Sequence, residues 1–107
     1  MIDKEHTLAF HALERLINLY DGYGRSYQIA GRPLLLIQQN GQRYLLINQC
    51  PHQQMPLTRG RLSDGFIQCP SHGMRFNLTT GATADGCSNR LQFLKLCYDG
   101  ATIGVNL

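Results

Sequence analysis

Four side chains in the middle of the chain have the types and the spacing of metal ligands. Cys50 and His52 form a C-x-H pair, Cys69 and His72 form a C-x-x-H pair, and sixteen residues separate the two pairs. The Asp64-Gly65 dipeptide between them predicts a tight hairpin turn, because Asp-Gly tolerates the positive φ angles of a type I′ turn. A hairpin brings its two ends together, so both pairs can meet at one point.

Two thiolates and two imidazoles at one point indicate metal binding, and two kinds of centre compete for such a set. Zinc takes a tetrahedral Cys₂His₂ set, but its common spacings group the cysteines as C-x₂₋₄-C and the histidines as H-x₃₋₅-H. This chain alternates Cys, His, Cys and His, which suits a cluster with two chemically distinct irons. A structural zinc module that mediates binding stays open as the alternative.

The segment CPHQQMPLTRGRLSDGFIQCPSHGMRFNLTTG, residues 50–81, resembles the Rieske family. The family pattern is C-x-H, then 15 to 17 residues, then C-x-x-H-G. Further positions of the pattern also match in register, namely Leu57, Gly60, Gly73, Phe76 and the Thr80-Gly81 turn.

The resemblance implies one Rieske-type 2Fe–2S cluster with four ligands from this chain. Cys50 and Cys69 would hold the inner, buried iron, and His52 and His72 would hold the outer iron near the surface. Two neutral imidazoles in place of two thiolates leave the oxidised core without net charge, which raises its reduction potential above that of an all-cysteine cluster.

Departures from the family pattern favour the soluble, low-potential ferredoxins of bacterial oxygenase systems. In Rieske proteins of respiratory cytochrome bc-type complexes a disulfide links the two cluster loops, and its cysteines would fall at Met55 and Ser71. The same subgroup has hydrogen-bond donors where this chain has Met74 and Phe76, which cannot donate. Fewer donors stabilise the reduced cluster less, so we expect a potential in the lower part of the Rieske range.

The elements that must position these loops read as strands joined by two-residue turns. Asn40-Gly41, Asp64-Gly65 and Asp99-Gly100 each lie between apolar runs, as in hairpins. We expect strands at 7–11, 26–30, 34–38, 43–48, 66–69, 74–78, 91–98 and 102–106. A stripe of Leu13, Leu16, Ile17 and Tyr20 follows a helical period and predicts one short helix near residues 13–20. The expected fold is an all-β, Rieske-like antiparallel sandwich or small barrel with a cluster-binding subdomain of two loops.

Length and composition fit one small domain with no room for a second. The 107 residues would form a single Rieske domain, 1–107, with the cluster-binding subdomain at about 49–81. No apolar run exceeds four residues, so no transmembrane helix is expected. The net charge of +3 and the lack of a Lys/Arg cluster in the sequence argue against binding of nucleic acid. The N-terminus has no apolar segment typical of a secretion signal, so we expect the protein to reside in the cytoplasm.

The function that the resemblance implies is that of a monomeric one-electron carrier without catalytic residues. It would take electrons from a flavin-dependent reductase and pass them to a terminal oxygenase or a similar acceptor. A Rieske-like small subunit of a larger oxidoreductase, such as nitrite reductase, remains the alternative beside the zinc module. A third alternative is a redox sensor that responds to loss of its cluster.

The remaining cysteines and histidines have ordinary interpretations. Cys97 lies in an alternating strand and is expected to pack as a small apolar side chain, whereas Cys87 is expected in a loop as a free thiol. His6 and His11 lie more than 35 residues from the first ligand pair and are expected to be surface or locally satisfied residues.

Overall fold

The computed structural model describes residues 8–51, 55–71, 73–83 and 90–107, and in these ranges the regular structure is antiparallel β-sheet apart from one turn of 3-10 helix. The strands are β1 (Phe10–Arg15), β2 (Gly24–Ile29), β3 (Arg32–Gln39), β4 (Gln42–Ile47), β5 (Arg61–Ser63), β6 (Phe66–Gln68), β7 (Arg75–Asn77), β8 (Phe93–Leu94), β9 (Cys97–Asp99) and β10 (Thr102–Asn106). They form three sheets, with orders β1-β10-β9, β2-β3-β4-β8 and β5-β6-β7. The all-β prediction is confirmed.

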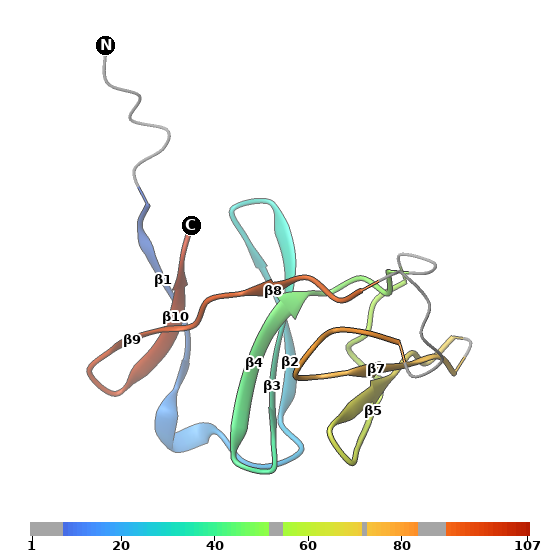
Figure 1. Cartoon of the computed structure of the whole chain (residues 1–107). Helices are drawn as coiled ribbons and strands as arrows, with labels where there is room; N and C mark the ends of the chain where they lie inside the picture. The colour runs from blue at the N-terminus through green and yellow to red at the C-terminus, as the bar shows by residue number, and fades with distance from the viewer. Residues whose placement is uncertain (1–7, 52–54, 72, 84–89) are drawn as a thin grey trace.

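The central sheet lies between the other two and supplies a buried surface to each of them (Figure 1). Successive side chains of a strand point to opposite faces. In β3, Leu34 and Leu36 pack with Ile103 on the side of the β1-β10-β9 sheet, whereas Leu35 and Ile37 pack in the core beside the β5-β6-β7 sheet. The four residues are at most 1% exposed. Burial on both faces explains why this strand contains an unbroken run of four apolar residues.

Tight turns connect the hairpins, and one of them has no signal in the sequence. Asn40-Gly41 and Asp64-Gly65 have positive φ at both residues, as a type I′ turn requires. The turn between β2 and β3 also has positive φ at both of its residues, Ala30 (φ 52°) and Gly31. In the last hairpin Asp99 still pairs with Thr102, so Gly100 and Ala101 form the turn in place of the predicted Asp99-Gly100.

The predicted helix at 13–20 is wrong. Residues 10–15 pair with β10, and only Leu16–Asn18 form a turn of 3-10 helix, η2. A β-bulge between Ala12 and Glu14 interrupts the two-residue alternation of β1. Leu13 and Leu16 pack against the same core, three positions apart, which imitates a helical stripe. The rest of that stripe is exposed, with Ile17 at 83% and Tyr20 at 62%.

The chain after residue 90 links two sheets, so the single strand expected at 91–98 is also wrong. β8 pairs with β4 in the central sheet, whereas β9 pairs with β10 in the first sheet. Figure 1 shows this segment crossing from the side of β5 and β7 to the side of β9. No helix in the described ranges has the length and the hydropathy needed to cross a membrane.

Candidate metal centre

Cys50 and Cys69, the two cysteines of the predicted ligand set, lie in one apolar core. Cys50 follows strand β4 and Cys69 follows strand β6, and they are 0% and 1% exposed. Both belong to the cluster of buried side chains between the central sheet and the β5-β6-β7 sheet, which also contains Leu57 and Phe76. The structure therefore brings the two predicted thiol ligands to the same interior region.

Each cysteine begins a loop, and an equivalent backbone hydrogen bond closes each of the two loops. In the first cysteine loop, residues 50–55, the N–H of Cys50 donates to the carbonyl oxygen of Met55 (N···O 2.6 Å). In the second, residues 69–74, the N–H of Cys69 donates to the carbonyl oxygen of Met74 (N···O 2.8 Å). Each of the two buried thiols therefore begins a segment whose fifth following residue returns a carbonyl oxygen to the cysteine N–H.

A buried asparagine, which sequence reasoning missed, holds the first loop in place. The Asn48 side chain is 8% exposed, and its Oδ1 accepts a hydrogen bond from the Leu57 N–H at 2.8 Å. Its Nδ2 donates to Thr58 Oγ1, also at 2.8 Å. A buried amide needs such partners because an unsatisfied polar group in the core costs about 1–3 kcal/mol. The only signal in the sequence is a polar residue at the end of an apolar strand, two positions before Cys50.

Close packing joins the exit of the first loop to the strand that carries the second. Gly60 lies against β6, where an added Cβ would be 2.7 Å from the Gln68 carbonyl oxygen and 2.8 Å from Ile67 Cγ1. The side chain of the same Gln68 reaches into the second loop, where its Nε2 donates to the Gly73 carbonyl oxygen at 3.1 Å. Gly60, predicted as an accessory position of the motif, thus allows the exit of the first loop to approach β6, and Gly73 accepts the bond that ties the second loop to the same strand.

The turn after β7 is built around one asparagine side chain. Asn77 Oδ1 accepts hydrogen bonds from the N–H groups of Thr79 and Thr80, and the Asn77 carbonyl oxygen accepts one from Gly81. Gly81 has φ +81°, and an added Cβ would be 3.0 Å from the Leu91 carbonyl oxygen. In the predicted Thr80-Gly81 turn, position 81 is therefore one at which only glycine fits without strain.

The chemistry of the described donors fits an iron–sulfur cluster on its thiolate side. Two buried thiols in one apolar core are the kind of donors that the cysteine half of a mixed Cys/His cluster site requires. His52 and His72 lie outside the described residues. In the part of the chain that the structure describes, no group of three Cys, His, Asp or Glu side chains forms a complete metal site.

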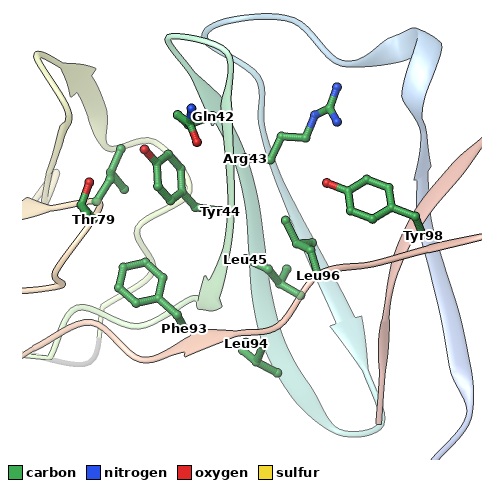
Figure 2. Close-up of a pocket in the computed structure, with 10 residues that line it drawn as sticks. Gln42, Arg43, Tyr44, Leu45, Thr79, Phe93, Leu94, Leu96 and Tyr98 are labelled. Atoms are coloured by element: carbon green, nitrogen blue, oxygen red, sulfur yellow. The ribbon is translucent and has the colours of Figure 1, made fainter.

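A hollow of about 570 Å³ opens between the β3–β4 hairpin and the segment after β8. Figure 2 shows the aromatic rings of Tyr44 and Phe93 on one side of it and Tyr98 with Arg43 on the other. No Cys, His, Asp or Glu lines it. Its polar lining consists of hydroxyl, amide and guanidinium groups.

The other candidate residues separate from the cysteine loops. His11 and Cys97 lie in the β1-β10-β9 sheet, on the opposite side of the central sheet from β5 and β7 (Figure 1). Cys97 is a half-buried free thiol rather than a core residue. His6 and Cys87 lie outside the described residues. Among the apolar residues in and beside the first loop, Leu57 is fully buried and Met55 is 46% exposed.

Comparisons with known proteins identify one protein family. Residues 11–94 match the family model described as the Rieske [2Fe-2S] domain. Human apoptosis-inducing factor 3 is 38% identical over 68 residues, which cover 64% of this chain and 11% of that protein. The chain thus spans about a tenth of the length of the first curated relatives that it matches.

Two ferredoxins match over most of the chain. The ferredoxin component of the alkene monooxygenase system of Xanthobacter autotrophicus is 26% identical over 87 residues, which cover 80% of this chain and 71% of that one. The solved structure of the ferredoxin of carbazole 1,9a-dioxygenase from Nocardioides aromaticivorans IC177 is 25% identical, with a TM-score of 0.78 over 90% of this chain and 95% of that one.

Proposed function

The chain belongs to the Rieske [2Fe-2S] domain family, whose members hold one 2Fe–2S cluster, and we propose that it acts as a one-electron carrier rather than as an enzyme. When bound, the cluster supplies a single-electron couple whose potential depends on its ligands. The observation that carries the proposal is the pair of buried thiols, Cys50 and Cys69, at the start of two loops closed by the same hydrogen bond.

The proposed ligand set is Cys50 and Cys69 on the inner iron and His52 and His72 on the outer iron. The burial of both thiols in one apolar core supports the inner pair. The position of each histidine, two residues after Cys50 and three after Cys69, supports the outer pair. In this scheme the chain is a single domain, 1–107, with its cluster-binding subdomain at about 49–81.

The chain's own residues set the conditions for electron transfer. The apolar core around Cys50 and Cys69 excludes water from the thiolate side, and the side chain of buried Phe76 has no hydroxyl to donate to the cluster. Fewer donors leave the negative charge of the reduced state less stabilised, which lowers the potential. We therefore expect a midpoint in the lower part of the Rieske range; a midpoint well above zero would contradict this reasoning.

The proposed partners are redox proteins, with a flavin-dependent reductase as donor and a terminal oxygenase as acceptor. The similarity to the ferredoxin components of an alkene monooxygenase and a carbazole 1,9a-dioxygenase system supports an acceptor of the oxygenase class. We propose that the carrier acts as a monomer in the cytoplasm, where the free Cys97 thiol stays reduced.

Cysteine variants test the proposal directly. Cys69→Ser is expected to yield protein without stoichiometric iron and sulfide and without visible absorption, because the inner iron loses a thiolate. Cys97→Ser is the matched control and is expected to keep both, since Cys97 lies in another sheet. Full iron and colour in Cys69→Ser would refute the ligand assignment, and stoichiometric zinc in the wild-type chain would make it a binding module.

A further inference from the structure

A row of polar side chains crosses the outer face of the β5-β6-β7 sheet at its cysteine-loop end. The register pairs Arg61 with Gln68 and Gln68 with Arg75, so the three residues lie side by side on one face. The opposite face of the same strands carries Ile67 and Phe76, which are buried in the core. Arg61 and Arg75 are exposed, and their guanidinium groups therefore project from the outer face.

A hollow connects this row to the second cysteine loop. It measures about 390 Å³, and its lining includes Arg59, Arg61, Gln68, Cys69, Pro70 and Gly73. Gln68 belongs to the row and also donates to the Gly73 carbonyl oxygen of the loop. The arginines of this end of the molecule thus adjoin the segment that begins at the buried Cys69 thiol.

The positive charge of this face is not neutralised within the described residues. Residues 48–83 contain three arginines, Arg59, Arg61 and Arg75, and a single carboxylate, Asp64. Asp64 lies in the β5–β6 turn, at the opposite end of the hairpin from Cys69. No described carboxylate forms an ion pair with any of the three arginines. Arg75 lies over the ring of Phe66, 4.5 Å from its centroid, which leaves its charge exposed.

We propose that this arginine face, defined as Arg59, Arg61 and Arg75, is the docking surface for a redox partner protein whose own docking surface is rich in Asp and Glu. The proposal rests on the proposed function, because an electron must leave through the surface nearest the cysteine loops. Complementary charge at that surface accelerates encounter and orients the partners, and it selects against a basic partner. Exposed Met55 adds apolar contact area on the neighbouring first loop.

Stopped-flow oxidation of the dithionite-reduced holoprotein tests this proposal with two protein acceptors of opposite surface charge. Cytochrome b5 presents an acidic surface, and cytochrome c presents a basic one. For the wild-type chain, the rate constant with cytochrome b5 is expected to fall steeply as ionic strength rises, whereas the rate constant with cytochrome c rises or stays level. Arg61→Gln/Arg75→Gln is expected to lower the low-salt rate with cytochrome b5 roughly three- to tenfold and to flatten its salt dependence.

Lys95→Gln/Arg15→Gln is the matched control, because it removes the same charge from exposed positions outside the β5-β6-β7 sheet. It is expected to change the cytochrome b5 rate less than twofold. Equal effects of the two double variants, or equal salt dependence with both acceptors, would overturn the proposal. Co-purifying nucleic acid or a salt-dependent dimer that requires the same arginines would assign the face to that occupant instead. A chain that dithionite cannot reduce would refute the proposed function itself, separately from the docking surface.

Discussion

Replacing Gly60 with alanine tests whether the two cysteine loops depend on the close contact between them. The added Cβ would lie 2.7 Å from the Gln68 carbonyl oxygen, 2.8 Å from Ile67 Cγ1 and 2.9 Å from the Leu57 carbonyl oxygen, whereas ordinary contacts begin near 3.4 Å. Two of the three clashes are with backbone atoms, which cannot rotate away. Gly60 has no positive φ, so the cost is entirely steric.

The magnitude follows from the size of these overlaps. Overpacking of a filled core costs about 1–3 kcal/mol, and clashes with backbone atoms put Gly60→Ala at about 2–3 kcal/mol. For a domain of this size, that loss lowers Tm by roughly 8–15 °C. Because the displaced strand β6 leads directly to Cys69, the variant is also expected to lose its cluster earlier on heating.

Thermal unfolding followed by far-UV circular dichroism and by visible absorption, at one scan rate, measures both effects. Gly24→Ala is the matched control, because no heavy atom lies within 4 Å of its added Cβ. It is expected to change stability by less than about 1 kcal/mol. Equal Tm and equal iron retention in Gly60→Ala and Gly24→Ala would show that the loops tolerate separation at this point.

Two further predictions concern parts of the fold away from the loops. Glu14→Gln removes a carboxylate whose pKa is held at about 2 by hydrogen bonds from Asn18 and Tyr23. Since this pKa lies below the ordinary 4.5, the stabilisation is complete above pH 4.5 and is lost as the pH falls toward 2. The unfolding free energies of wild type and variant, measured in urea, should differ by about 2 kcal/mol at pH 6 and by less at pH 3, and a difference independent of pH would contradict this. Ala30→Asn should raise the unfolding free energy by about 0.5–1 kcal/mol, because asparagine tolerates φ 52° better than alanine. Asn40→Ala, at the matching position of the next turn, should lower it by a similar amount, and a loss in Ala30→Asn would refute the explanation.

Local signals in the sequence predict most of the sheet structure. Asn-Gly and Asp-Gly mark the turns at residues 40–41 and 64–65 because these residue types tolerate positive φ. Ala30 has the same conformation without that chemistry, since the pairing of β2 with β3 over six residue pairs holds the turn in place. Tertiary pairing thus imposes a conformation that no local preference indicates.

Long-range pairing also explains the two errors of secondary structure. The apolar spacing at residues 13–20 comes from a bulge in β1, which depends on the partner strand β10 at the other end of the chain. The apolar segment 91–98 reads as one strand, but its two halves pair with different sheets. The partner of β1, strand β10, and the partner of β8, strand β4, both lie far away in the sequence.

At the site, the sequence identifies side chains with a known chemistry and misses those that only hold the backbone. Cys50 and Cys69 are predicted from type and spacing, and the structure buries them in one core. Asn48 has no such signature, because an asparagine beside a loop is ordinary until its two buried hydrogen bonds are seen. The arginine face likewise emerges only from the strand register, since Arg61 and Arg75 lie fourteen positions apart in the sequence.

Low-temperature EPR of the dithionite-reduced protein tests the mixed Cys/His ligation most directly. Two histidines on the reducible iron lower the average g value clearly below that of all-cysteine 2Fe–2S ferredoxins, and we expect such a spectrum from the wild-type chain. An average g value equal to that of all-cysteine ferredoxins would contradict the roles of His52 and His72. Freshly purified, iron-bearing protein that gives no signal after reduction would contradict the cluster itself.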